Sequence, residues 1–331
     1  MGVSSSTTVA NWILTEVMSQ EALAPLRGKT GVLLQFLNFA DISGRSSKVR
    51  KIRKKSAIAA AVDDTEALAF STPATLGVAA NISITPTTKV QGIQVTTDAI
   101  ELALPGVSRA QVIAAIESGN PASLMFVRDV MMEIMEAHYL RAEEDSLALF
   151  SGLSESAGTT NTSLSFATLL DALLKVLDNN PSSEDLVFVL EEQGIADLRT
   201  LAAGGSGAAL SSIFTGNGAG DVSFFNHRPD VSRNGFRGSF AGVPIYAANK
   251  AVMATANAGV DRVAALIVAG RGETGTPGSV RGFAEMVERY EPSLGFQYDL
   301  ADDTLLAVGR SCWAVGEHTD EHGCKIIYDL D

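Results

Sequence analysis

The feature that most constrains the fold is a stretch without glycine or proline that runs from position 122 to position 151. Asn120 and Pro121 precede it as a helix cap and a first helical residue, and Gly152 ends it. A helix over residues 121–151 is about 45 Å long and far exceeds the average of about 11 or 12 residues, so we expect it to be the backbone of the molecule. Apolar side chains at helical spacing would form its buried face: Leu124, Val127, Met131, Ile134 or Met135, and Ala142.

Residues 1–45 predict an N-terminal arm. The segment is rich in Ser and Thr at first and then carries short apolar clusters, which Pro25, Gly28 and Gly31 separate. Such clusters are too short to form a core of their own, so we expect them to lie on the rest of the protein. Their members are Trp12, Ile13, Leu14, Val32, Leu33, Leu34, Phe36 and Leu37.

Residues 46–97 have the pattern of extended chain. Ile82 and Ile84 alternate with polar neighbours in NISIT, and GIQVT repeats this alternation. Proline and glycine interrupt the segment, which favours a long irregular β-hairpin over a central strand. A hairpin this polar is poorly stable alone, so we expect it to need a neighbouring surface. The interrupting residues are Pro73, Gly77, Pro86 and Gly92.

Beyond Gly152 the sequence predicts an α/β arrangement. Residues 164–180 have the pattern of an amphipathic helix, and residues 186–190 that of a buried strand leading into a helix that ends at Gly204. Residues 204–239 are glycine-rich and predict a loop. Strand patterns then return at residues 243–248, 264–270, 305–318 and 325–330.

Composition excludes several classes of protein. No segment approaches the roughly 20 apolar residues that span a bilayer, and the N-terminus lacks the pattern of a signal peptide. Cys312 and Cys324 are too few for a disulfide scaffold and fit a reducing compartment. An apolar fraction of 46% indicates a folded chain. We therefore expect a cytoplasmic protein that packing stabilises.

A run of six cations within eight residues stands out in a chain of net charge −13. It has no interleaved aromatic residue and no groove-reading helix, and the net charge of the chain repels nucleic acid at long range. Residues 45–55 hold seven of the 25 basic residues and no acid, so the rest of the chain carries −20. We expect the run to pair with acidic surface on another copy, with phosphate binding as the alternative. Its members are Lys48, Arg50, Lys51, Arg53, Lys54 and Lys55.

No catalytic site emerges from the sequence. Ser206 lies in GGSGA, but no buried strand leads directly into it and Ala208 replaces the second glycine of a nucleophile elbow. The glycine-rich residues 270–278 lack the lysine of a phosphate-binding loop. His138 lies on the predicted long helix and His227 in a loop, so the histidines offer no obvious base for a nucleophile. We therefore expect a protein without enzymatic activity or a cofactor.

The segment HTDEHGC is the best candidate for a metal site, but it has the pattern of a solvated turn between two strands. We expect no metal there. Paired acids are expected on solvated faces or at contacts between copies. The residues of the HTDEHGC segment with ligating side chains are His318, Asp320, Glu321, His322 and Cys324, and the paired acids are Glu143 with Glu144, Glu191 with Glu192, and Asp302 with Asp303.

The order of these parts resembles the major capsid proteins of tailed bacteriophages with the Hong Kong 97 fold. NISITPTTKVQGIQVTTDAIEL looks like the second half of the family's extended loop, and EEDSLALFSGL like the end of its spine helix. DLVFVLEEQGIADLRTLAAGGSG resembles the strand and helix of the family's axial domain, and GSFAGVPIYAANK its loop-then-strand segment. The resemblance covers roughly residues 45–316.

The resemblance implies an α+β fold with an arm, an extended loop, a spine helix in a peripheral domain, and an α/β axial domain. The loop would include Pro73, Gly77, Ile82, Ile84, Pro86 and Lys89. The implied divisions are residues 1–45 for the arm, 46–97 for the loop, 98–163 for the peripheral domain with its helix at 121–151, 164–285 for the axial domain, and 286–331 for strands returning to both domains.

The resemblance also implies assembly into pentamers and hexamers of an icosahedral head around double-stranded DNA. Portal and scaffolding proteins, and cement proteins in some members, would be partners, and the head would assemble in the host cytoplasm as part of a virion. Some members carry a removable N-terminal scaffolding segment that is longer than the roughly 45 residues that precede the loop here. This difference favours a separate scaffolding protein. Some members cross-link a loop lysine to a C-terminal asparagine, but no asparagine follows Asn257, so we expect a non-covalent shell. The alternatives are an encapsulin-type nanocompartment and a soluble α/β hydrolase using Ser206.

Overall fold

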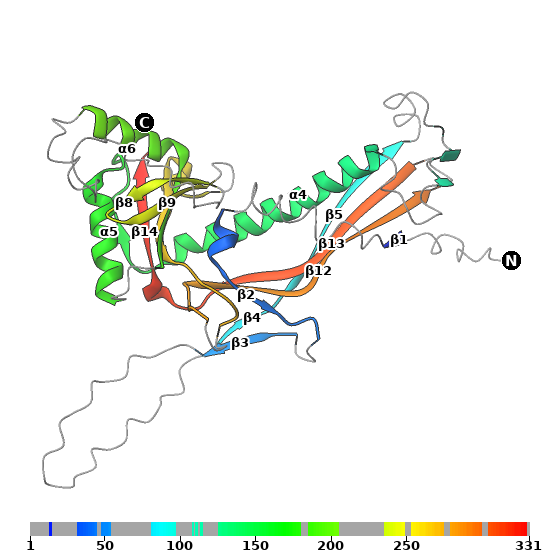
Figure 1. The fold of residues 1–331 in the computed structure, drawn as a ribbon, viewed down its shortest axis with the longest axis horizontal. Helices are drawn as coiled ribbons and strands as arrows, with labels where there is room; N and C mark the ends of the chain where they lie inside the picture. The colour runs from blue at the N-terminus through cyan, green and yellow to red at the C-terminus, as the bar shows by residue number, and fades with distance from the viewer. Residues whose placement is uncertain are drawn as a thin grey trace, which may run out of the picture.

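The computed structural model describes residues 13–14, 32–44, 48–53, 81–96, 108, 110–111, 113–114, 125–179, 185–204, 235–248, 253–274, 279–299 and 304–329. Within these residues the protein is α+β. A long helix runs beside a long, narrow sheet, and one end of this sheet meets a second sheet that carries two further helices (Figure 1). The architecture therefore has an elongated part and a more rounded part.

The elongated part is a five-stranded sheet built on one long antiparallel pair, β12 and β13. β5 pairs with β13, whereas β1 and the parallel strand β2 pair with β12. The register of the long pair shifts on both sides of Tyr290, beside Pro292, which has no backbone N–H to donate. The strands are β1 (Ile13–Leu14), β2 (Asn38–Asp41), β5 (Thr87–Thr96), β12 (Ala284–Asp299) and β13 (Thr304–Glu317).

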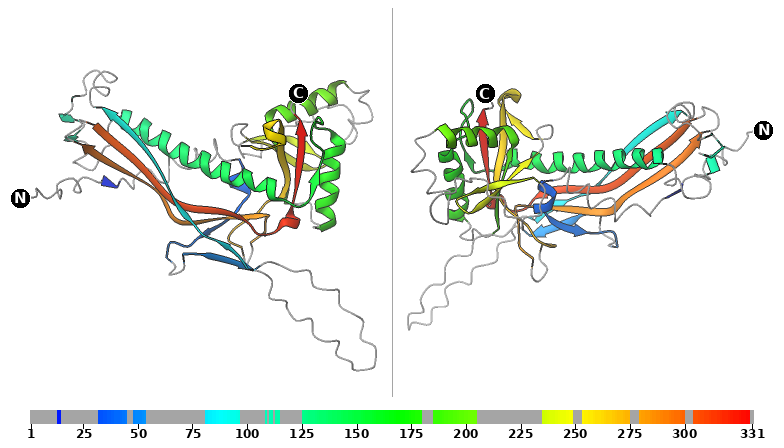
Figure 2. Two further views of the ribbon diagram at one scale, coloured as in Figure 1. Left: turned by 180° about the vertical axis from the view of Figure 1, so that it is seen from behind. Right: turned by 45° about the horizontal axis from the view of Figure 1, so that its top comes forward.

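Helix α4 (Met125–Ala148) lies along β13 and β5 and forms the backbone of the elongated part (Figure 2). Ile134, Met135 and Ala142 are buried, as the sequence predicts. Val127 and Met131 lie on the helix, but their side chains, like the whole of Leu124, fall outside what the structure describes. None of the described helices combines the length and the apolar character that a membrane span requires.

The predicted helix ends three residues early, because the chain tightens into a 3-10 turn, η5 (Leu149–Gly152). Phe150 is fully buried in this turn, with its ring 5.9 Å from that of Phe283. The Leu153 N–H donates to the Phe150 carbonyl and closes the turn. The tighter winding of the 3-10 turn thus directs the Phe150 ring into the core.

The rounded part is a seven-stranded sheet in which β6, β14, β11, β7, β9 and β8 follow one another, with β10 also beside β11. Its last strand in the sequence, β14, lies between β6 and β11. The strands are β6 (Ser156–Ala157), β7 (Leu186–Glu191), β8 (Phe236–Phe240), β9 (Val243–Ala248), β10 (Ala254–Ala256), β11 (Asp261–Val268) and β14 (Gly323–Asp329).

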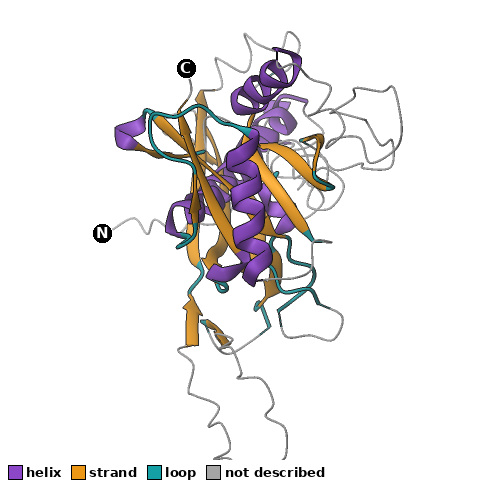
Figure 3. Ribbon diagram, turned by 90° about the vertical axis from the view of Figure 1, so that its left-hand side faces the viewer, coloured by secondary structure: helices purple, strands orange, loops and turns teal. Residues whose placement is uncertain are grey.

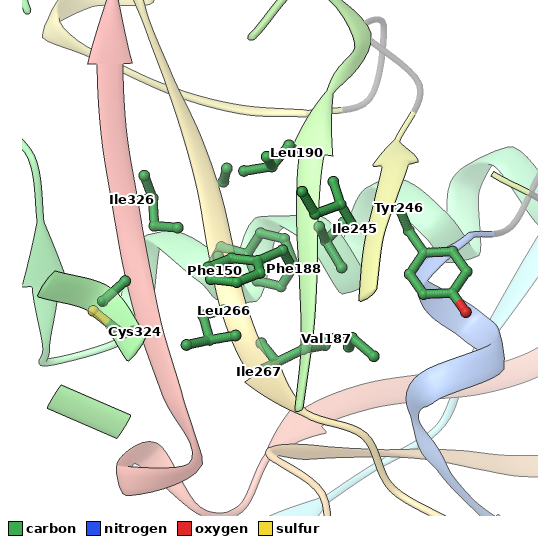
Figure 4. Packing of buried hydrophobic residues seen from close by; sticks show 14 of the residues in the cluster. Phe150, Val187, Phe188, Leu190, Ile245, Tyr246, Leu266, Ile267, Cys324 and Ile326 are labelled. Carbon is green, nitrogen blue, oxygen red and sulfur yellow. The ribbon is translucent and has the colours of Figure 1, made fainter. Parts of the chain in front are cut away.

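Two helices pack on this sheet, α5 (Phe166–Asn179) on β6, β11 and β14, and α6 (Glu192–Gly204) on β7 and β9. In Figure 3, where this end of the molecule faces the viewer, a helix lies in front of the strands. All six residues of β7 are buried, which confirms the strand and the following helix that the sequence predicts. Figure 4 shows Phe188, Leu266 and Ile326 side by side in this core.

The sequence does not predict the hairpin of β8 and β9, because residues up to 239 have a loop pattern. Ala241 and Gly242 form its two-residue turn with φ of 49° and 83°. Positive φ at both positions matches the twist of paired strands, but alanine is an uncommon residue there. The prediction of a loop up to residue 239 is therefore wrong at Phe236–Phe240, which form a strand.

The arm contributes to the core through a 3-10 turn, η3 (Leu33–Phe36). Leu33 and Phe36 are fully buried, and the Phe36 ring lies edge-on to Tyr246 of β9 at 4.7 Å. The expectation that this apolar cluster lies on the rest of the protein is confirmed. The arm thereby fastens the N-terminal part of the chain to the rounded part.

A two-stranded ribbon, β3 (Arg50–Arg53) with β4 (Asn81–Ile84), lies near the junction of the two sheets (Figure 1). Ile52 and Ile84 bury one face of it against β2 and β12. The structure differs here from the predicted hairpin over residues 46–97, because β5 leaves the ribbon and pairs with β13 over ten residues. The polar pattern of β5 is that of an edge strand with one half-buried face.

Candidate functional site

The basic run divides at the ribbon, because successive side chains of a strand point to opposite faces. Arg50 lies on the same face as the buried Ile52, whereas Lys51 is exposed, as is Lys48 before the strand. Arg53 ends β3, and Lys54 and Lys55 lie outside the described residues. The exposed members are available to a neighbouring molecule, and the prediction that they meet another copy stays a prediction.

Arg50 forms an ion-pair network within its own chain. Its Nη1 is 2.9 Å from Glu273 Oε1, and its Nη2 donates to the Thr274 carbonyl at 2.9 Å and lies 3.5 Å from Glu285 Oε1. The Glu285 side chain is fully buried. Burial raises the pKa of this carboxyl, and the Arg50 cation opposes the shift.

Asn38 of β2 holds the connection between β11 and β12 beside this network. Its Nδ2 donates to the carbonyls of Gly272 and Val280 at 2.9 and 2.8 Å, and its Oδ1 accepts from the Gly282 N–H at 2.8 Å. Asn38 is fully buried. The connection therefore has defined partners on both the arm and the ribbon.

The metal candidate is a turn between β13 and β14, and its histidines are part of the same polar region. His318 is buried, and Arg281 Nε donates to its Nδ1 at 3.3 Å. Burial, helped by the Arg281 cation, lowers the pKa of His318 to about 3. Burial also raises the pKa of the Cys324 thiol to about 12. Among the described residues no three His, Cys, Asp or Glu side chains converge on a metal site.

His138 and Ser311 form a hydrogen bond that has the residue types of a catalytic dyad. His138 Nδ1 and Ser311 Oγ are 2.9 Å apart, and both side chains are buried between α4 and β13. Burial lowers the pKa of His138. No substrate reaches a serine buried in this way, so the contact holds the helix to the sheet. Ser206, which the hydrolase alternative needs, lies outside the described residues, as does His227.

Lys89, predicted in the extended loop, lies on β5 within the five-stranded sheet. Its Nζ is 3.4 Å from Asp145 of α4 and 5.0 Å from the centre of the Trp313 ring. These contacts engage the amine within its own chain. Of the other predicted loop residues, Ile84 is buried, Ile82 and Pro86 are half-buried, and Pro73 and Gly77 are outside the described residues.

Glu143 was expected on a solvated face or at a contact between copies, and this expectation is wrong, because the side chain is buried within its own chain. The side chain is buried, and the Leu33 N–H donates to its two oxygens at 2.8 and 3.1 Å while the Leu34 N–H donates to Oε2 at 3.2 Å. The carboxyl thus satisfies the free N–H groups at the start of η3. Burial raises its pKa to about 7, against the effect of these donors.

Glu191 also contradicts the expectation for the paired acids, because it is buried within its own chain and accepts from Arg262 Nε at 3.0 Å. Glu144 and Glu192 are exposed, as expected. Asp302 and Asp303 lie outside the described residues. The helical spacing indicates burial of Glu143, since Tyr139, one turn earlier on the same side of α4, is buried.

Exposed apolar side chains mark a further surface that the sequence does not predict. Leu170 and Leu174 lie one turn apart on α5 and are 47% and 54% exposed. The ion pair of Lys175 with Asp171, 2.7 Å apart, borders them. Single exposed leucines are ordinary, whereas larger contiguous apolar patches are typical of contact surfaces.

No protein-family model matches the sequence, and no curated protein is significantly similar to it. Solved structures match over nearly the whole chain. One from Mycobacterium phage Che8 has a TM-score of 0.52 at 13% identity, over 86% of this chain and 85% of that one. The capsid of an empty GTA particle has a TM-score of 0.52 at 12% identity, over 91% and 90%. The head of Helicobacter pylori bacteriophage KHP40 has a TM-score of 0.50 at 9% identity, over 91% and 91%.

These matches show the fold. The chain has the α+β fold of phage major capsid proteins, the Hong Kong 97 fold, as the resemblance predicts. An encapsulin from Synechococcus elongatus PCC 7942 also matches, with a TM-score of 0.45. That score is too low to favour the nanocompartment alternative.

Proposed function

We propose that this protein is the major capsid protein of a tailed phage. Copies of it assemble as pentamers and hexamers into an icosahedral head that encloses double-stranded DNA. The observation that carries the proposal is the match of the fold to phage capsid and head structures over at least 85% of both chains. In this proposal α4 is the spine helix, the ribbon begins the extended loop, and the seven-stranded sheet belongs to the axial domain.

The surfaces of the subunit support a role in tiling. An elongated sheet with a helix along it has long sides, so each copy has room for several weak contacts with neighbours. Lys48 and Lys51 are exposed on a chain whose net charge is −13, and acidic surface of another copy would complement them. The described Ser–His contact is buried, which supports a structural role over catalysis.

The proposed shell is non-covalent. Lys89 is engaged with Asp145 and Trp313 of its own chain, and no asparagine follows Asn257. The head would be part of a virion assembled in the host cytoplasm. Its further partners would be portal and scaffolding proteins and DNA bound without sequence specificity, together with cement proteins if it follows the members of the family that have them.

Electron microscopy of the full chain purified after expression alone, with light scattering for mass, tests the proposal. Closed shells, or free pentamers and hexamers, support it. Shells of uniform small size that co-purify with a bound enzyme would favour the encapsulin alternative. A monomer that never assembles as salt and crowding are varied would contradict assembly, and labelling of Ser206 by a serine-reactive probe would then favour a hydrolase.

A further inference from the structure

Arg50 faces the protein where its neighbour Lys51 faces solvent. The strand alternation places Arg50 on the face of Ile52, which packs with Ile84 against the five-stranded sheet. The Arg50 side chain is only 14% exposed. One cation of the basic run is therefore committed to its own subunit.

The guanidinium of Arg50 joins the ribbon to two other segments. Glu273 and the Thr274 carbonyl belong to the connection between β11 and β12, and Glu285 is the second residue of β12. The Thr274 N–H also donates to Glu285 Oε1 at 3.3 Å, which closes the network. Since β11 belongs to one sheet and β12 to the other, the contacts of Arg50 join the ribbon to the connection between the two sheets.

The ion-pair network of Arg50 is expected to contribute little to the free energy of unfolding. Arg50 Nε and Glu285 Oε2 are buried, and neither has a hydrogen-bond partner among the described residues. Removing charges from water is costly, and apolar side chains of similar size often serve stability as well. Apolar contacts such as that of Ile52 with Ile84, however, tolerate changes in packing direction. A planar guanidinium with partners on two nitrogens holds one orientation.

We propose that Arg50 is a positioning residue, which fixes the direction in which the ribbon leaves the subunit through its contacts with Glu273, Thr274 and Glu285. This inference rests on the proposed function, in which the ribbon begins the loop that reaches a neighbouring copy. A constant direction gives each copy the same reach toward its neighbour, so that particles close at one diameter.

The test compares Arg50→Met/Glu285→Gln, Arg50→Lys and the control Lys51→Met, which changes the outward face of the same strand. Hydrogen exchange of the unassembled full chain is measured for residues 50–53 and 81–84, beside the thermal midpoint and the diameters of assembled particles. In the double variant these amides should exchange about tenfold faster than in the unchanged protein, while the midpoint shifts by less than about 4 °C. Its particles should vary in diameter.

Arg50→Lys should show an intermediate increase in exchange, because lysine keeps the positive charge but lacks the planar group of donors of the guanidinium. Lys51→Met should show no increase. Unchanged exchange at the ribbon in both Arg50 variants would overturn the inference. So would faster exchange throughout the chain with a large fall in the midpoint, because Arg50 would then be a general stabilising contact. If the unchanged protein never assembles, the proposed function fails. Hydrogen exchange at the ribbon still tests whether Arg50 fixes the direction of the ribbon.

Discussion

The buried carboxyl of Glu143 connects the arm to α4, so replacing this residue tests how much the connection contributes to stability. Replacing it with alanine leaves the N–H groups of the buried Leu33 and the half-buried Leu34 without this acceptor. Each unsatisfied buried donor costs about 1–3 kcal/mol, so we expect Glu143→Ala to lower the free energy of unfolding by about 2–4 kcal/mol in mildly acidic solution. Glu144→Ala, one residue along on the exposed side of α4, should change it by less than about 1 kcal/mol.

The effect of Glu143→Ala should also depend on pH. Burial raises the pKa of Glu143 from 4.5 to about 7, so the folded state holds this proton where the unfolded state has released it. The stabilisation is therefore fully present below pH 4.5 and is lost as the pH rises through about 7. At about 1.4 kcal/mol per unit of pKa, the loss amounts to about 3 kcal/mol, and the difference from alanine should shrink accordingly.

Urea denaturation of unassembled subunits at about pH 5, 6, 7 and 8 measures both quantities, since the midpoint and slope give the free energy of unfolding. Hydrogen exchange at Leu33 and Leu34 reports the same contact locally. Equal stability of the Glu143→Ala and Glu144→Ala proteins at about pH 5 would refute the buried connection. A difference that grows with pH would refute the raised pKa.

Other regions give independent predictions. Lys48→Glu/Lys51→Glu should prevent or strongly slow assembly, and added salt should weaken assembly of the unchanged protein, because both cations are exposed; normal shells from the doubly reversed protein would exclude this interface. Phe36→Ala should lower the free energy of unfolding by about 3–5 kcal/mol in urea denaturation, because its ring is fully buried against Tyr246; a change below about 1 kcal/mol would contradict the docking of η3. Assembled particles should give one band of monomer mass on a denaturing gel, and a ladder of larger bands would disprove the non-covalent shell.

The local elements with strong patterns could be predicted from the sequence. β7 is a run of apolar residues that ends in a helix with a glycine terminus, and both elements form there. The long helix follows from the absence of glycine and proline and from buried positions at helical spacing, such as Ile134. These signals are local, so no knowledge of the partners was needed.

The residues whose burial the sequence does not predict have partners far away in the sequence. The burial of Glu143 follows from η3, which lies 110 residues earlier and supplies the donors. The inward position of Arg50 follows from Glu273 and Glu285, more than 200 residues later. A charged residue in a paired or basic run looks solvated until such partners are known, because charge is almost never fully buried without them.

Cryo-electron microscopy of particles formed by the full chain tests the central claim most directly, because a reconstruction shows both closure and subunit arrangement. The account predicts closed icosahedral shells with pentamers at the vertices and hexamers between them, each subunit having α4 along the five-stranded sheet. A protein that stays a monomer of 34.7 kDa under all salt and crowding conditions, with no shell in any image, would contradict it.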